Sequence, residues 1–190
     1  MGCVYWNTMS QQKQARQQAG TVEESEALRI PEDKAEQLVD ALNTDLASTY
    51  VLYHQVKKHH WTVEGAEFRD IHLFLGEVTD DLEESADMLA ERAQAIGGVP
   101  LSGGSTYEQR APVTPEGEDV FAIRTGLQND MEMFADLIQA VREHIQLARN
   151  LGDYNTEEIL KGILEGLEDH AHHIEHYLED DTLVGEEFLN

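Results

Sequence analysis

Long apolar segments are absent from this sequence. No run of apolar residues reaches the roughly 18 that a membrane-spanning helix needs, and the apolar opening from Met1 to Trp6 is short and lacks the basic flank of a signal peptide. The single cysteine, Cys3, excludes a framework of internal disulfide bonds. We therefore expect a soluble, cytoplasmic protein with no membrane partner.

Lysine is also scarce. Only five of the 13 basic residues are lysine, against 38 acidic residues, and the formal net charge is −25. The negatively charged side chains repel one another in dilute buffer. At molar salt the Debye length falls to about 3 Å and this repulsion is screened. The composition therefore favours a halophilic protein. An ordinary acidic protein, or one with a metal-binding surface, is the alternative.

Basic residues near the N-terminus are too few to favour nucleic acid. Before Arg29, only Lys13 and Arg16 carry positive charge, and they lie in a Gln-rich stretch. DNA binding depends on Lys and Arg that neutralise phosphates and release counterions, and high salt weakens that attraction. The sequence therefore disfavours DNA binding.

Helical spacing of apolar residues fills most of the rest of the chain. The pattern predicts helices over about 31–60, 67–96, 118–150 and 155–180, and no stretch has the alternation of a strand. Three of the four prolines fall in 99–117, which predicts a long connection there. Four long amphipathic helices with one long connection indicate an all-α four-helix bundle. Phe68 in the second helix and Phe121 in the third belong to the predicted apolar stripes.

The two ends of the chain differ in composition from the helices. Residues 1–29 are polar and Gln-rich without an apolar period, which predicts a flexible tail. The bundle is then expected to cover 30–180, and 181–190 to form a C-terminal tail. Met9 stands just before the polar stretch, so translation starting there is an alternative to Met1.

Histidines and carboxylates in the first two predicted helices have the spacing of a metal site. His60 ends the first helix, His72 lies just inside the second, and Asp87 and Glu91 lie further along it. Imidazole together with carboxylate suits iron, zinc or manganese better than calcium. A helix turns by about 100° per residue, which places His72, Asp87 and Glu91 near 100°, 160° and 200° from the core-facing Ile71. These three side chains are therefore expected to face away from the core. A merely solvated acidic face is the alternative interpretation.

The length of the second helix separates these candidate ligands. Asp87 follows His72 by fifteen residues, which is about 22 Å along a helix, so the two cannot share a metal within one subunit. An antiparallel copy related by a twofold axis would bring His72 of one chain to Asp87 and Glu91 of the other, with His60 nearby. A site inside the bundle core is disfavoured, because no histidine has Glu three residues before it.

This pattern resembles the Dps family of miniature ferritins. The residues that carry the resemblance are His60-Trp61-Thr62-Val63-Glu64-Gly65-Ala66-Glu67-Phe68, then His72, then Asp87-Met88-Leu89-Ala90-Glu91-Arg92, then Gly97-Gly98. The resemblance extends over about residues 30–180. The acidic composition and the His-rich segment 172–179 resemble the halophilic archaeal branch.

The resemblance implies a ferritin-like four-helix bundle with a short helix in the long connection, assembled as a hollow homododecamer. It also implies a di-iron ferroxidase site at each twofold interface, with His60 and His72 from one subunit, Asp87 and Glu91 from its partner, and Trp61 beside the iron. Members typically oxidise Fe(II), preferably with hydrogen peroxide, and deposit ferric mineral inside. We therefore expect a role in iron storage and in protection against oxidative damage.

One position departs from the family pattern. The family commonly has Asp four residues after the second histidine, and this sequence has Gly76 there. The neighbouring Glu77 lies about 100° further round the helix, and whether it compensates is left open. The missing carboxylate bears on how tightly a second iron binds.

Acidic residues also open the last helix. The resemblance implies that Asp153, Glu157 and Glu158 line a threefold pore that admits cations. Carboxylates that interact with the positive end of the helix dipole are an equally good interpretation.

The remaining histidines are separate from this pattern. His172 and His176 share a helix face and are a candidate secondary metal site. Side chains that favour the negative end of the helix dipole are the alternative. His54 and His144 stand alone, and we expect structural roles for both.

Three other functions remain as alternatives. A DNA-compacting protein with incidental iron binding would retard DNA at its working salt concentration. An inert structural or signalling bundle would take up no iron. An ordinary ferritin would need the core-facing Glu-x-x-His pairs that this sequence lacks.

Overall fold

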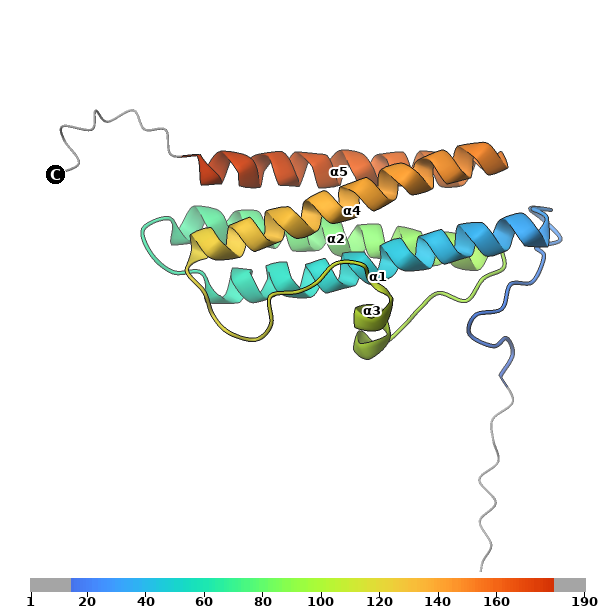
Figure 1. Cartoon of the computed structure of the whole chain (residues 1–190), viewed down its shortest axis with the longest axis horizontal. Helices are drawn as coiled ribbons and strands as arrows, with labels where there is room; N and C mark the ends of the chain where they lie inside the picture. The colour runs from blue at the N-terminus through green and yellow to red at the C-terminus, as the bar shows by residue number, and fades with distance from the viewer. Residues whose placement is uncertain (1–14, 180–190) are drawn as a thin grey trace, which may run out of the picture.

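The computed structural model describes residues 15–179. These residues form α1 (Glu32–Thr62), α2 (Phe68–Ala95), α3 (Gly104–Arg110), α4 (Ile123–Leu151) and α5 (Tyr154–Leu178), and the part described contains no strand. Figure 1 shows the four long helices side by side, with the short α3 outside α1. The predicted all-α bundle, with a short helix in its long connection, is confirmed.

The chain passes through the bundle as two helix pairs. α1 lies antiparallel to α2, and α4 lies antiparallel to α5, with α1 against α4 and α2 against α5. Between the pairs, the connection runs back along α1 and carries α3, so that α4 begins at the same end as α2 (Figure 1). Within residues 15–179, no helix is both long and apolar enough to cross a membrane.

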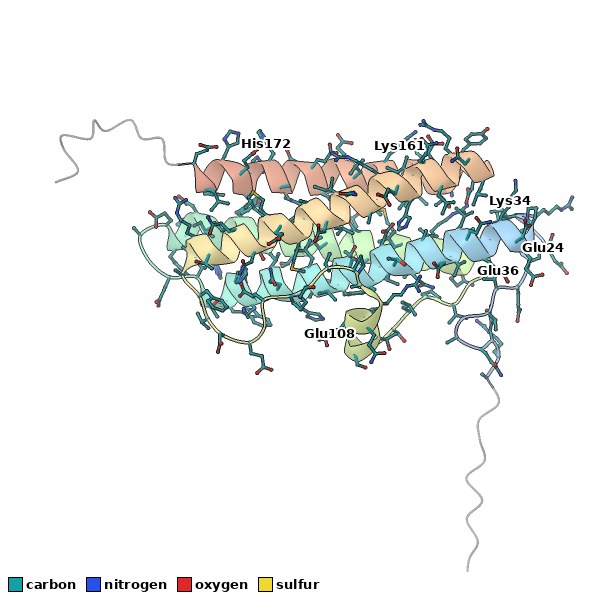
Figure 2. All side chains as sticks on the ribbon, in the orientation of Figure 1. Glu24, Lys34, Glu36, Glu108, Lys161 and His172 are labelled. Atoms are coloured by element: carbon teal, nitrogen blue, oxygen red, sulfur yellow. The ribbon has the colours of Figure 1, made fainter. Side chains whose placement is uncertain are left out.

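Apolar side chains from all four long helices form one continuous core. On α1, for example, Leu38, Leu42 and Leu46 recur about once per turn and are almost completely buried. Charged side chains take the opposite faces, and Figure 2 shows Glu36 and Lys161 pointing outward from the bundle. Burial of the amphipathic stripes supplies the stability that isolated helices lack.

The third long helix begins later than the sequence predicted. The other boundaries lie within two residues of the prediction, but α4 begins at Ile123 and not near 118. Gly117 has a φ of 91°, outside the helical region. The Lys58 ammonium donates to the carbonyls of Gly117 and Asp119, which holds this segment in a loop against α1.

Two aromatic residues that we assigned to the apolar stripes lie outside the core. Phe121 precedes α4 in the loop held by Lys58 and is 44% exposed. Phe68 is the first residue of α2 and is 46% exposed, because only the following turn faces the other helices. The predicted apolar stripe therefore began about one turn too early in both α2 and α4.

The N-terminal segment makes contacts that its polar composition did not predict. Residues 15–29 form no helix, but Gln17 Nε2 and the Glu23 amide both donate to the Gly97 carbonyl, at 2.8 and 2.9 Å. Gly97 has a φ of 96°, and a Cβ there would lie 1.8 Å from the Glu23 carbonyl oxygen. Only glycine permits this approach. Cys3, Met9 and 181–190 lie outside the described residues.

An ion pair between a buried carboxylate and a half-buried imidazole joins α1 to α4. The His144 Nδ1–H donates to both oxygens of Asp45, at 2.8 and 2.9 Å. Burial alone would lower the pKa of His144, but the hydrogen bond and charge of Asp45 outweigh it and raise that pKa. Burial also raises the pKa of Asp45. His144 is thus placed in a structural contact.

Because the folded state holds these protons more tightly, the pair loses stability as pH rises. We expect His144→Gln to lower the free energy of unfolding by about 1–3 kcal/mol near about pH 6, since Asp45 loses a charged donor. The contribution is complete below about pH 6.5 and is lost as pH rises through the raised His144 pKa. The variant should therefore show a shallower fall in stability up to about pH 9.

Denaturant unfolding followed by circular dichroism in molar potassium chloride measures this slope. His54→Gln, which removes an exposed imidazole, is the control. A slope as steep in His144→Gln as in the parent would show that the pair does not carry the pH dependence.

Candidate metal centre

The turn between α1 and α2 brings His60 and His72 together. The Val63 amide donates to the His59 carbonyl and caps α1, and Gly65, with a φ of 111°, reverses the chain before α2. The two imidazole rings stack, with centroids 3.9 Å apart and planes 18° from parallel. The two predicted histidine ligands of one chain are therefore adjacent.

Reciprocal hydrogen bonds fix both rings. His60 Nδ1 lies 2.8 Å from the His72 carbonyl oxygen, and His72 Nδ1 lies 2.8 Å from the His60 carbonyl oxygen. A carbonyl only accepts, so each Nδ1 carries the proton. In the neutral rings each Nε2 then keeps its lone pair available for a metal. Metal-binding histidines in proteins are commonly held by this type of backbone contact.

The two predicted carboxylate ligands lie elsewhere on α2. Asp87 and Glu91 are exposed on its outer surface, as the helical angles predicted. Within residues 15–179 of one chain, no three His, Cys, Asp or Glu side chains are grouped so that they could hold a metal ion. One chain therefore brings together two of the four predicted ligands and leaves the other two apart.

Aromatic surface surrounds the histidine pair. Trp61, which follows His60, is 69% exposed, and Phe68 stacks on His72 with ring centroids 5.1 Å apart. Large exposed apolar side chains beside polar groups are typical of surfaces that contact another protein. Both aromatic residues are therefore exposed at the surface beside the histidine pair.

Glu77 lies in a different place from the histidine pair. It lines a groove between α2 and α5 together with Asp70, Phe74 and His173. The groove does not include His60 or His72. Glu77 therefore does not replace, within this chain, the carboxylate that the family pattern places at Gly76.

A buried charge cluster that the sequence pattern did not predict lies next to His60. His59 lies between two carboxylates, with Nδ1 2.7 Å from Asp130 and Nε2 2.7 Å from Glu116. Gln55 and Asn129 complete the cluster through hydrogen bonds to Asp130 and Glu116. A signal was available, because His59 and Asp130 occupy core positions of otherwise apolar helical stripes.

The charges of this cluster compensate one another. Burial alone would lower the pKa of His59, but Asp130 and Glu116 outweigh it and raise that pKa. Burial would raise the pKa of Glu116, but Lys58, Asn129 and His59 lower it to about 2. Gly126 makes room for the ring, since a Cβ there would lie 3.1 Å from His59 Nε2. The cluster joins the end of α1 to α4 and to the connection.

Asp153 has the capping role that was one of the two interpretations. It begins α5 as the N-cap, accepting from the Thr156 amide, and it binds Arg92 of α2 at 2.7 Å. Both partners of this ion pair are buried. Burial would raise the pKa of Asp153, but Arg92 and Thr156 lower it. Its carboxylate is fully engaged within the chain.

The other two predicted pore residues differ from Asp153 and from each other. Glu157 is buried and pairs with Arg149 and Lys161, at 2.8 and 2.6 Å. Glu158 is largely exposed, with only a distant contact to Lys161 at 3.8 Å. Of the three, Glu158 is the carboxylate with the most open access to solvent.

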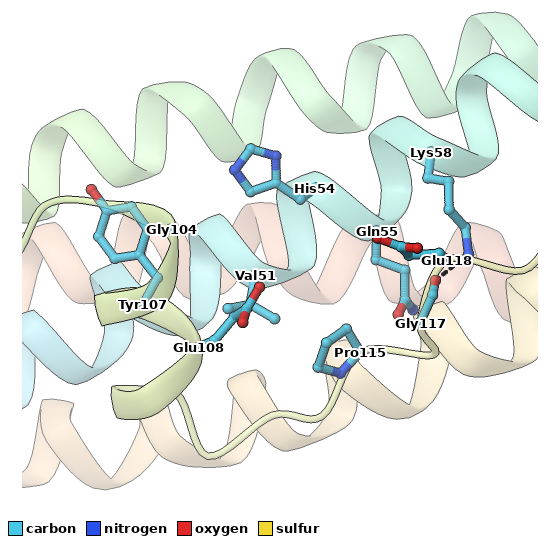
Figure 3. Close-up of a pocket in the computed structure, with 10 residues that line it drawn as sticks. All are labelled: Val51, His54, Gln55, Lys58, Gly104, Tyr107, Glu108, Pro115, Gly117 and Glu118. Atoms are coloured by element: carbon cyan, nitrogen blue, oxygen red, sulfur yellow. Dashed lines mark hydrogen bonds between the residues drawn. The ribbon is translucent and has the colours of Figure 1, made fainter.

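A histidine pair on α5 and a pocket beside α3 lie away from His60 and His72. His172 and His176 are brought together on α5, with their Nε2 atoms 3.0 Å apart. Separately, a pocket of about 280 Å³ lies where α3 meets α1 (Figure 3), and Val51, Tyr107 and Pro115 form much of its wall. Lys58 at its edge is held by the Gly117 carbonyl (Figure 3). His54, Glu108 and Glu118 also line this pocket (Figure 3).

Comparison with known proteins decides the family. A family model of the ferritin-like domain matches residues 39–184. A DNA protection during starvation protein from Halobacterium salinarum is 63% identical over 176 residues, covering 93% of this chain and 97% of that protein. The chain belongs to the Dps family of ferritin-like proteins. The resemblance found from the His60–Glu91 pattern is thereby confirmed.

Solved Dps structures have the same fold. The crystal structure of an archaeal Dps homologue from Halobacterium salinarum has 62% identity and a TM-score of 0.89, covering 94% of this chain and 99% of that one. Dps from Vibrio cholerae, with 27% identity and a TM-score of 0.73, covers 77% of this chain and 92% of that one. The latter is described as a member of a broad superfamily of ferritin-like diiron-carboxylate proteins.

Asp153 caps α5 from a buried position, whereas Glu158 is exposed, so the two carboxylates should contribute differently to stability. We expect Asp153→Ala to lower the free energy of unfolding by about 3–5 kcal/mol, because Arg92 is left buried without its partner. Glu158→Gln, at an exposed position, should change it by no more than about 0.5 kcal/mol. Denaturant unfolding of both variants in molar salt compares them. Equal stability of the two would contradict the capping role.

Proposed function

We propose that this protein oxidises Fe(II), preferably with hydrogen peroxide, and stores the ferric product inside a hollow dodecamer. The observation that carries the proposal is the His60–His72 pair, whose Nδ1 protons are engaged by backbone and whose Nε2 atoms are available for iron. Dps membership and the diiron-carboxylate superfamily of the Vibrio cholerae relative support iron as the substrate.

The other ligands are proposed to come from a second subunit. Asp87 and Glu91 lie on the same outer surface of α2 as His72, too far along the helix to reach it. A twofold axis beside α2 would place the partner's carboxylates at this chain's histidines, and the reverse, giving two equivalent sites. Trp61 and Phe68 supply exposed aromatic surface for such an interface.

The chemistry needs two electrons for each peroxide. Two Fe(II) ions each give up one electron, the O–O bond breaks, and two protons complete two molecules of water. In this proposal His60 and His72 hold iron without adding charge, and the partner's carboxylates favour the ferric product as oxygen ligands. Delivery of both electrons at one site avoids release of a hydroxyl radical.

Cation entry and secondary binding extend the proposal. Glu158 is the exposed carboxylate near the start of α5, so we assign it to the pore in place of Asp153. The His172–His176 pair is assigned as a secondary metal site, because a 3.0 Å separation of the Nε2 atoms is close to that of two nitrogens on one metal.

Stopped-flow oxidation of Fe(II) by the assembled protein in molar salt, with peroxide and with air compared, tests the proposal. We expect His72→Ala and Asp87→Ala each to slow peroxide-driven oxidation by at least about tenfold, since each removes an iron ligand. His54→Ala and Glu84→Ala are matched controls, because they remove an exposed imidazole and an exposed carboxylate of α2's outer surface. Unchanged rates in both ligand variants would overturn the proposal.

Mixed assemblies test the sharing of ligands between subunits. A dimer of one His72→Ala subunit and one Asp87→Ala subunit contains one site with both defects and one intact site. Random co-assembly of the two inactive variants should therefore restore about a quarter of the sites. Ligands drawn from a single chain would restore none.

DNA contact is the second candidate function, favoured by the names of relatives. One relative, from Synechococcus, is called a nutrient stress-induced DNA-binding protein and is 34% identical over 160 residues. The aligned region covers 84% of this chain and 91% of the Synechococcus protein. Several cations of this chain are already paired with carboxylates, including Lys58, Arg92 and Arg142. We therefore assign any protection of DNA to removal of iron and peroxide.

A gel-shift titration measures direct DNA contact. With a net charge of −25, we expect no retardation of duplex DNA at molar salt and none at about 0.1 M salt, where phosphate attraction is stronger. Retardation at molar salt would revive the DNA-compacting function.

A further inference from the structure

His60 lies in the last turn of α1, which ends at Thr62. The last four carbonyl groups of a helix have no partner in a following turn, so helix ends open more readily than helix centres. The bonds between His60 and His72 hold the two rings to each other, but they do not attach either ring to α4. A metal ligand in this turn therefore keeps one orientation only if other contacts fix the turn.

A small rotation of this turn would move the ligand atom of His60. The tip of a side chain lies about 5–6 Å from the helix axis, so a rotation of about 10° displaces it by about 1 Å. A metal site needs its ligand atoms placed to within about 0.5 Å. The contacts that prevent rotation at the end of α1 therefore decide where His60 Nε2 lies.

His59 attaches this turn to α4. Neighbouring residues point about 100° apart on a helix, so His59 points into the bundle, where it is 5% exposed, while His60 points toward α2. Asp130 of α4 lies 2.7 Å from His59 Nδ1, and Gly126 of α4 lies beside the ring. The turn that carries His60 is thus fixed to α4 through the residue before it.

Gln55 repeats the attachment one turn earlier. Its Nε2 donates to Asp130 at 2.9 Å, and its Oε1 accepts from the Glu116 amide at 2.8 Å. Residues four apart share a helix face, so Gln55 and His59 bind the same two partners from successive turns. A single attachment would leave α1 free to pivot about it, whereas two attachments about 6 Å apart along the axis resist rotation.

Glu116 is the member of this cluster that belongs to no helix. Its carboxylate is 5% exposed and lies in the connection between α2 and α4. It accepts from Asn129 at 2.6 Å, lies 2.7 Å from His59 Nε2, and forms an ion pair with Lys58. Lys58 and His59 directly precede His60, so one carboxylate holds both residues next to the ligand.

We propose that Glu116 is a positioning residue, whose carboxylate fixes the last turn of α1 so that His60 presents Nε2 to the metal. This inference rests on the proposed function, because it assumes that His60 binds the metal. It gives a role in metal binding to a buried cluster that lies outside the four-ligand pattern. The connection, which supplies no ligand, then determines the geometry of the half-site.

Binding of Co(II) to the assembled protein in molar salt tests the inference without iron turnover. Co(II) bound by imidazole and carboxylate has visible absorption bands that report both affinity and ligand geometry. The bands that the parent shows and His60→Ala lacks belong to the His60 site. We expect Glu116→Ala to weaken this binding at least about tenfold and to change the shape of these bands, because His60 Nε2 is displaced.

Glu116→Asp is the second variant, and it separates geometry from charge. It keeps the negative charge, but its shorter side chain cannot reach Lys58, His59 and Asn129 together. Positioning therefore predicts a change of band shape in the same direction, with binding weakened at least about threefold. A Glu116→Asp protein with the affinity and the bands of the parent would overturn the inference.

Asp45→Ala is the matched control for loss of stability. It also removes a buried carboxylate that joins α1 to α4 through a histidine, His144. Asp45 precedes His60 by fifteen residues, which is about 22 Å along the helix. This variant should unfold at lower denaturant concentration but bind Co(II) within about twofold of the parent, with unchanged bands. Equal changes of the bands in Asp45→Ala and Glu116→Ala would show a general loss of stability and overturn the positioning role.

A double-mutant cycle identifies His60 as the route of the effect. In a His60→Ala background, Glu116→Ala should leave the remaining Co(II) affinity unchanged, because the displaced ligand is already gone. The same loss with and without His60 would overturn the positioning role. Hydrogen exchange provides a reading without metal, since the backbone amides of the last turn of α1 should exchange faster in Glu116→Ala than in the parent.

Failure of the proposed function gives a different result. In that case the parent and His60→Ala would bind Co(II) alike, and the metal site itself would be overturned together with the role of Glu116. If the parent shows the bands and His60→Ala does not, the site stands, and the Glu116 variants decide the inference by themselves. Circular dichroism and the assembled mass of each variant confirm that the bundle and oligomer are retained.

Discussion

The short turn between α1 and α2 is the constraint on which the rest of this subunit depends. It closes the first helix pair of the bundle, and the two histidines at its ends bind each other's backbone through Nδ1. The same bonds that hold the helices in register therefore fix the imidazoles. A shift of one residue between α1 and α2 would break these bonds and separate the two imidazoles. The proposed metal site therefore depends on the same hydrogen bonds that set the helix register.

A second constraint is the placement of charge. The chain is strongly acidic, but three sets of carboxylates inside it form ion pairs between segments. These are Asp45 with His144, Asp153 with Arg92, and Asp130 and Glu116 with His59. Buried charges are tolerable only when paired and hydrogen-bonded. Each of these ion pairs links helices that are distant in sequence. The few basic side chains therefore hold the helices together, while the excess carboxylates lie on the surface.

The sequence predicted the fold, and the outward direction of two candidate ligands, because both follow from periodicity. Three-residue and four-residue spacing located the helices, and the same angles placed Asp87 and Glu91 outward, where they lie. Other features were missed because contacts between distant segments have no periodic signature in the sequence. Lys58 holds the segment before α4 in a loop, so that α4 begins later than predicted, and the Gly97 carbonyl accepts hydrogen bonds from Gln17 and Glu23 of the N-terminal segment. His59 was visible as a polar residue at a core position, but its partners depended on the fold.

The separation of the histidines from the carboxylates along α2 has a consequence for newly made subunits. In the proposed site the carboxylates come from a partner, so the His60–His72 pair of a lone chain would be an incomplete site, and within residues 15–179 no three His, Cys, Asp or Glu side chains are grouped to hold a metal. Iron oxidation would then begin only after subunits pair. Because pairing depends on the square of the subunit concentration, the oxidation rate of a dilute protein would rise steeply with that concentration. Unassembled chains would then not oxidise iron outside the proposed hollow assembly.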